Sequence, residues 1–140
     1  MGQPVQGQMD LQAPGDVITG MVASSVATPF IGGQPVKMED SAGGVPKYLP
    51  LAANTDKTDA FVITSPIFAN RAAGKVMEVA VGGYMWMTAG GAIARDSLVE
   101  VVYTTNKVIV SGGTNPVVGK ALDKAAADGD MIRVKIIIPQ

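Results

Sequence analysis

Short apolar and β-branched runs recur along this chain, separated by clusters of Gly, Pro, Asn and Asp at intervals of roughly 8 to 12 residues. This spacing predicts an all-β protein: a single compact barrel or sandwich-like domain with little or no helix. In the first half of the chain the runs cover residues 17–27, 34–39, 46–52 and 60–64. Pro46 and Pro50 favour an edge position for the third run, because proline cannot donate a hydrogen bond to a neighbouring strand.

Two hairpins are predicted in the second half. Residues 75–89 alternate in period two on both sides of Gly82-Gly83, a pair that supplies the positive φ values of a tight hairpin turn. Residues 98–103 and 107–110 flank a turn in which Asn106 is suited to the left-handed conformation. The final run, residues 131–138, places Ile132, Val134, Ile136 and Ile138 on one face and points Arg133 and Lys135 away from it, which predicts a half-buried strand.

Residues 118–127 are ambiguous. Val118, Leu122 and Ala125 have helical spacing, the alanine content favours helix, and Asn115-Pro116 is a helix-start signal. A helix of ten residues is marginal without packing partners, however, and glycine at position 119 weakens its first turn. The local pattern therefore favours a short helix, with a strand as the alternative.

Residues 1–15 differ from the rest of the chain in composition. They hold four glutamines, two prolines, three glycines and one charged residue, Asp10, so they have little to pack and little helix propensity. We predict an extended N-terminal arm over residues 1–15, followed by one β-rich domain over residues 16–140.

Composition removes several classes of function. The net charge is -1, without the Lys/Arg excess of a nucleic-acid binder. The chain has no cysteine and no histidine, so it lacks thiolate and imidazole metal ligands and the commonest general base. Neither a signal peptide at the start nor a run of about 18 apolar residues is present, so we expect no membrane association.

Three patterns suggest chemistry and fail on inspection. The stretch from Gly113 to Ala121 differs from a phosphate-binding loop by one residue in its spacing and lacks the final hydroxyl. Asp128-Gly129-Asp130 is not followed by the acidic ligands of a calcium loop, so we interpret it as a turn with backbone-capping aspartates. The acidic pairs Asp56 with Asp59 and Glu39-Asp40 lie in polar loops, and no serine has a histidine partner. We therefore predict no enzymatic activity and no catalytic, cofactor or metal site.

The largest apolar cluster is Tyr84, Met85, Trp86 and Met87. On a strand these side chains alternate between two faces, so only one pair faces a one-sided core. Tyr84 and Trp86 are candidates for a subunit interface, because aromatic residues are enriched at interfaces. Burial of all four in a strand covered on both sides is an equal alternative.

The order of these features resembles the decoration, or cement, proteins of tailed-phage capsids. The resemblance rests on Gly74 to Val79, on Ala92 to Val99, and most of all on the ending from Val118 to Val134. That ending is similar to a "G-x-A-L-x-x-A-x-x-G-D-x-x-x-V" pattern with one extra residue before the Gly-Asp pair. Arg95 departs from the family pattern, which has glycine before the aspartate.

The resemblance implies a structural virion protein that binds the exterior of an assembled capsid and clamps neighbouring subunits of the major capsid protein. It also implies a homotrimer made in the host cytoplasm, and a strand at residues 118–127 that folds back on the last strand. Capsid contacts are expected in the arm, where main-chain hydrogen bonds would add a strand to a neighbour's sheet. The candidate contacts are Gln3, Pro4, Val5, Gln6, Met9 and Leu11.

The alternative function is a glycan- or protein-binding module of a phage tail or fibre, acting through Tyr84 and Trp86. A hydrolase using Asp128 or Asp130 ranks last.

Overall fold

The computed structural model of the chain describes residues 4–10, 17–40, 44–64 and 71–138, and these residues form ten strands and no helix. The all-β prediction is therefore confirmed. The strands are β1 (Val17–Val22), β2 (Pro35–Met38), β3 (Lys47–Pro50), β4 (Ala60–Val62), β5 (Val76–Ala80), β6 (Tyr84–Thr88), β7 (Leu98–Val102), β8 (Lys107–Val110), β9 (Gly119–Ala121) and β10 (Met131–Ile136).

The first five strands close into a barrel in the order β1-β3-β2-β4-β5, with β5 paired back to β1. Its pairs are antiparallel except for β1 and β3, which run parallel. The interior is filled by apolar side chains from every strand and from the loop after β1: Val22, Phe30, Val36, Tyr48, Ala60, Val62, Met77 and Val79. Such a barrel is small enough for side chains to fill it.

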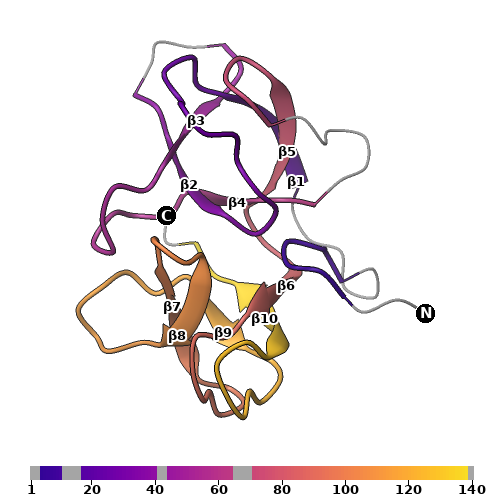
Figure 1. The fold of residues 1–140 in the computed structure, drawn as a ribbon, viewed down its shortest axis with the longest axis vertical. Helices are drawn as coiled ribbons and strands as arrows, with labels where there is room; N and C mark the ends of the chain where they lie inside the picture. The colour runs from indigo at the N-terminus through magenta and orange to yellow at the C-terminus, as the bar shows by residue number, and fades with distance from the viewer. Residues whose placement is uncertain (1–3, 11–16, 41–43, 65–70, 139–140) are drawn as a thin grey trace.

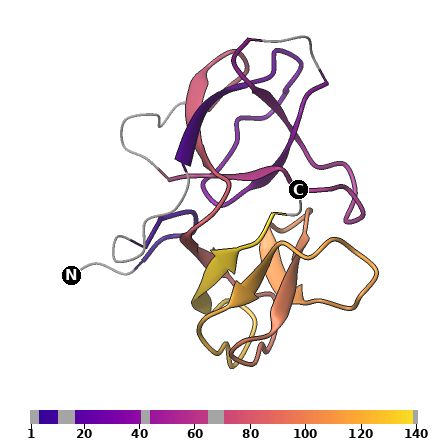
Figure 2. The ribbon, with the colours of Figure 1, turned by 180° about the vertical axis from the view of Figure 1, so that it is seen from behind.

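The last five strands form a second sheet in the order β6-β10-β9-β7-β8. The barrel makes up one end of the molecule and this sheet the other (Figures 1 and 2). One face of this sheet packs against the barrel. Phe61, Ile63 and Ala80 of the barrel half share a buried cluster with Met85, Met87, Val99, Ile132 and Val134 of the sheet. The two halves therefore have one common core in addition to the barrel interior.

The predicted hairpin over residues 75–89 is wrong. β5 belongs to the barrel, where it pairs with β1 and β4, whereas β6 pairs with β10 in the second sheet. Gly82-Gly83 thus carries the chain from one half to the other, with a φ of 87° at Gly83 and its carbonyl accepting a hydrogen bond from the amide of Ile136. Period two indicates two strands here but does not say which strands they pair with.

The predicted edge position of β3 is also wrong, because β3 pairs with β1 on one side and β2 on the other. Pro46 precedes the strand and Pro50 is its last residue. Both prolines thus sit at the ends of the strand, where a missing amide hydrogen does little to disturb the pairing.

The second predicted hairpin is confirmed. β7 and β8 pair antiparallel with Val102 opposite Lys107, and Asn106 has a φ of 58°. The final strand is confirmed as well, because Ile132, Val134 and Ile136 are buried while Lys135 is exposed.

Residues 118–127 contain strand β9 and no helix, so the local helix prediction is wrong and the strand implied by the resemblance is confirmed. β9 pairs with β10 and with β7. A Cβ atom on Gly119 would lie 2.5 Å from Val134 Cγ1 and 2.6 Å from the Lys135 carbonyl oxygen. Glycine is required here for close approach of the two strands, a reason that helix propensity does not register.

No membrane-spanning helix is found among the described residues.

Candidate functional site

The two faces of β6 have different surroundings. Met85 and Met87 are fully buried in the core shared with the barrel, whereas Tyr84 and Trp86 lie on the opposite face and are only partly buried. The outer face of the second sheet therefore carries the aromatic side chains that the sequence singled out. This outer face is the candidate interaction surface.

The segment of residues 7–10 runs along the free edge of β6. The amides of Gly7 and Asp10 donate to the carbonyls of Trp86 and Tyr84 at 2.8 and 2.9 Å, and the Trp86 amide donates to the Gln8 carbonyl at 2.9 Å. Met9 lies opposite Met85 in this antiparallel pairing and packs against the core. The described part of the predicted arm thus extends the protein's own sheet.

The expected capsid contacts in this segment have different environments. Gln3 and Leu11 lie outside the described residues. The Gln6 side chain is bonded within the protein: Nε2 donates to the Asn106 carbonyl at 3.0 Å, and Oε1 accepts from the Thr88 hydroxyl at 2.7 Å. Pro4 and Met9 are partly buried, whereas Val5 is 49% exposed.

Arg133 of β10 organises one part of the outer face. Its guanidinium group donates to both carboxylate oxygens of Asp123, at 2.8 and 3.0 Å, and lies 3.4 Å from Asp10 Oδ2. It also lies over the ring of Trp86, its cross-strand neighbour, 5.9 Å from the ring centroid. These hydrogen bonds hold the pKa of Asp123 below its ordinary value and raise that of Arg133. A shallow groove is lined by Asp10, Trp86, Asp123, Met131 and Arg133.

The next row of side chains crosses four strands in register. Lys135 lies opposite Tyr84 on one side and opposite Lys120 on the other, and Lys120 lies opposite Leu98. The neighbouring row, in which Val134 lies between Met85 and Ala121, is fully buried. The row from Tyr84 to Leu98 therefore faces away from the core.

The residues of the Asp128-Gly129-Asp130 turn have separate roles in the fold. Gly129 has a φ of 97°, and Asp130 Oδ2 accepts hydrogen bonds from the amides of Ala126 and Ala127 at 2.7 and 3.1 Å. Asp128 forms an ion pair with Lys107 at 2.8 Å. These contacts support the chain reversal before β10 and do not assemble a reactive site.

Other candidate groups are similarly occupied by backbone contacts. Asp56 accepts from the amides of Ala52 and Ala53 and from Lys37, which holds its pKa below the ordinary value. Asp59 accepts from the amide of Met38. In the part of the chain that the structure describes, no three potential metal ligands gather in one place.

The turn at Arg95 does not require the glycine that the family's "G-D" pattern has at this position. The left-handed residue is Asp96, with a φ of 71°, and Arg95 has no positive φ. Aspartate tolerates this conformation better than most residues, so arginine at position 95 is compatible with the turn.

Sequence reasoning missed the Asp123–Arg133–Trp86 cluster and the Lys120–Lys135 pair. Alternation in residues 131–138 had already placed Arg133 and Lys135 away from the core. The identity of their cross-strand neighbours depends on which strands pair with β10, and that is not encoded locally.

A family model for phage cement proteins matches residues 67–136, which is half of the chain and includes β5 to β10. Among solved structures, the crystal structure of the head fiber gp8.5 N base in bacteriophage phi29 is similar, with a TM-score of 0.55 and 15% sequence identity. The similarity covers 87% of this chain and 93% of that chain, and at this identity it shows a shared fold. No curated protein matches the sequence.

Proposed function

This chain belongs to the phage cement protein family, and from that membership we propose that it binds the exterior of an assembled capsid and clamps neighbouring subunits of the major capsid protein. The role is structural and involves no catalytic step. The protein is accordingly a capsid-associated component of the virion.

The observation that carries this proposal is the extent of the family match. Residues 67–136 include every strand of the second sheet, together with β5, which connects that sheet to the barrel. The matched half therefore includes the outer face with its partly exposed aromatic and basic side chains. Aromatic and arginine side chains are enriched at protein interfaces, which supports a binding role for this half.

A clamp does not need strong individual contacts. If three copies associate, as we propose, each capsid contact made by one copy raises the effective concentration for the contacts of the other two. Weak contacts with several capsid subunits then add up to stable binding. Native mass measurement of the purified protein tests the trimer independently of capsid binding.

The proposal is tested by mixing the purified protein with expanded capsids that lack it and sedimenting the particles. We expect the protein to sediment with the capsids at micromolar concentration and to raise the temperature at which they break open. Absence from the pellet contradicts capsid binding. Binding without any gain in capsid stability contradicts the clamp.

A second candidate function is supported by the groove beside Trp86. An aromatic ring next to the carboxylates of Asp10 and Asp123 resembles the mixture of apolar and polar groups found in small-ligand sites. The protein would then bind a glycan, as a module of a phage tail or fibre. Binding on a glycan array that disappears in Trp86→Ala supports this candidate, and absence of any array signal rejects it.

A further inference from the structure

Two lysines lie directly opposite each other on the outer face of the second sheet. Lys120 of β9 and Lys135 of β10 are Cα partners in the antiparallel pair. Like charges in this position destabilise a sheet, because their side chains leave the same face a few ångströms apart. The fold therefore gains nothing from this pair.

The charge of these lysines is poorly balanced. Lys120 Nζ lies 3.8 Å from Asp96 Oδ1, but both side chains are well exposed, at 43% and 66%, so the interaction is weak. Lys135 is exposed and forms no ion pair with any described residue. Arg133, by contrast, is neutralised by Asp123 and Asp10.

Apolar groups stand at both ends of the lysine pair. Tyr84 is the cross-strand neighbour of Lys135, and Leu98, which is 49% exposed, is the neighbour of Lys120. We call the four residues Tyr84, Lys135, Lys120 and Leu98 the lysine row. The row thus has a positive centre flanked by an aromatic ring and an aliphatic side chain.

We propose that the lysine row docks on an acidic patch of the assembled capsid shell. This inference rests on the proposed function and identifies the surface that performs it. An acidic protein surface relieves the repulsion between Lys120 and Lys135, while Tyr84 and Leu98 bury apolar area at the margins of the contact. Complementary charge also speeds encounter and sets the orientation of binding.

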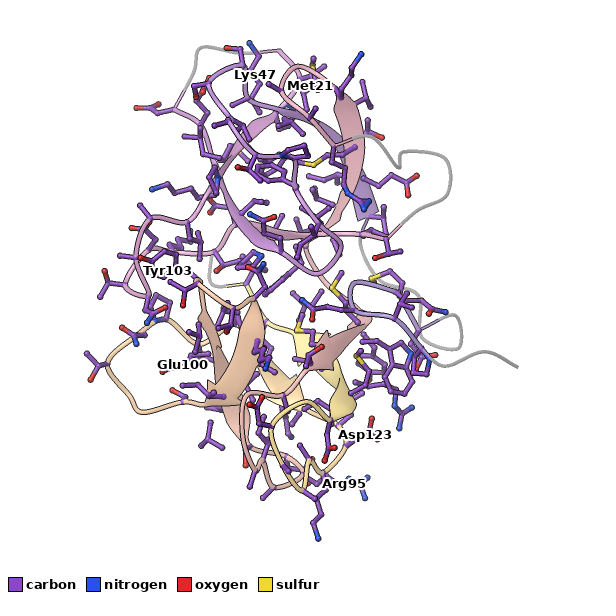
Figure 3. All side chains as sticks on the ribbon, in the orientation of Figure 1. Met21, Lys47, Arg95, Glu100, Tyr103 and Asp123 are labelled. Atoms are coloured by element: carbon purple, nitrogen blue, oxygen red, sulfur yellow. The ribbon has the colours of Figure 1, made fainter. Side chains whose placement is uncertain are left out.

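The test uses charge reversal in the full-length protein, with the variants Lys120→Glu and Lys135→Glu and the double variant. The matched control is Lys47→Glu, which changes the net charge equally. Lys47 is an exposed residue of β3 in the barrel, and Figure 3 shows it at the opposite end of the molecule from Asp123 and Arg95, which lie in loops between strands of the second sheet. Binding to capsids lacking the protein is measured by sedimentation at several salt concentrations.

Each single reversal in the lysine row is expected to weaken capsid binding by about tenfold or more, and Lys47→Glu to leave it unchanged. Wild-type binding should weaken with added salt, and the double variant should lose most of this dependence. Lys135→Glu places opposite charges at the cross-strand position, so its melting temperature should equal or exceed that of the wild type. Loss of binding in a protein of undiminished stability separates docking from folding.

Several results overturn the inference. Wild-type affinity in the double variant, or equal weakening by Lys47→Glu, shows that the lysine row does not dock. Dissociation of a purified oligomer by Lys135→Glu in the absence of capsids assigns the row to contacts between copies of the chain instead. If the wild type itself fails to bind capsids, the proposed function fails, and the inference with it.

Discussion

Arg133 joins three groups that are distant in the sequence. Asp10 precedes β1, Asp123 follows β9 and Trp86 lies in β6, yet all three contact one guanidinium group. Both carboxylates are partly buried, so these interactions are less screened than surface ion pairs. Sequence alternation predicted only that Arg133 points outward.

Replacing Asp123 tests the contribution of this cluster to stability. Asp123→Asn removes the paired charge and should lower the free energy of unfolding at neutral pH by about 1 kcal/mol. Because the pKa of Asp123 is lower in the folded protein than its ordinary value of 3.8, the stabilisation is complete above 3.8 and is lost as the pH falls through the folded-state pKa. Urea unfolding between about pH 6 and pH 2 should therefore show a steeper acid loss in the wild type than in the variant.

Asp128→Asn is the control for this experiment, because the Asp128 side chain is 65% exposed in its ion pair with Lys107. Such a pair contributes little, so the control should follow the wild-type curve. Identical acid profiles for the wild type and Asp123→Asn would contradict the assigned role of the pair.

At the level of elements, residues 6–10 act as an additional strand and as a link between the two halves. They cover the edge of β6, and a free edge exposes unpaired backbone groups that promote association. The Gly7 and Gln6 carbonyls also accept hydrogen bonds from the amide and hydroxyl of Thr64, respectively, two residues after the end of β4. Backbone hydrogen bonds, the Gln6 side chain and the packing of Met9 therefore hold this segment in place together.

Gly7 is a position in this segment that cannot accept a side chain unless the backbone moves. Gly7 has a φ of 84°, and a Cβ atom there would lie 2.3 Å from the Gly33 amide nitrogen and 2.6 Å from the Gly32 carbonyl carbon. Gly74 has a similar φ of 78° but has nothing within 4 Å of its Cβ position. Comparing alanine substitutions at the two glycines therefore separates the cost of a left-handed backbone from the cost of a steric clash.

Gly74→Ala should cost about 1 to 2 kcal/mol for the left-handed conformation alone. Gly7→Ala should cost about 1 to 3 kcal/mol more, because rigid backbone atoms must move. Urea unfolding of both variants measures the difference. Equal losses would mean that residues 6–10 shift without penalty and do not hold the halves together.

At the level of the whole molecule, the barrel and the second sheet are joined by a common core. Phe61 and Ala80 come from barrel strands but contact the sheet cluster, whereas Val62 points into the barrel. Successive side chains of β4 therefore point into two different cores. We expect the two halves to unfold together.

Phe61→Ala should lower the free energy of unfolding by about 3 to 5 kcal/mol and reduce amide protection in both β5 and β6. Val62→Ala, next to it in the same strand, removes packing from the barrel interior only and should affect β6 less. Hydrogen exchange measured by NMR distinguishes the two patterns. Loss of protection confined to one half in Phe61→Ala would show that the halves are independent.

Local patterns were sufficient where neighbours in sequence are also neighbours in space. The alternation of Met131 to Ile136 predicted which face of β10 is buried, and Asn106 predicted the turn of the β7–β8 hairpin. The similarity of residues 118–134 to a family ending predicted a strand where propensity favoured a helix. The class of fold and the membership in a phage cement family were therefore accessible from the sequence.

Tertiary structure alone decided the pairings that close the barrel and the partner of β6. Side chains alternate with period two whether β5 and β6 pair as a hairpin or belong to different sheets. The residues around Gly82-Gly83 therefore could not distinguish a hairpin turn from a connection between the two halves. Lys120 and Lys135 became neighbours only because β9 lies beside β10. A strand's own residues determine its faces, whereas its partners depend on long-range packing of the whole chain, and the candidate docking surface is a product of that packing.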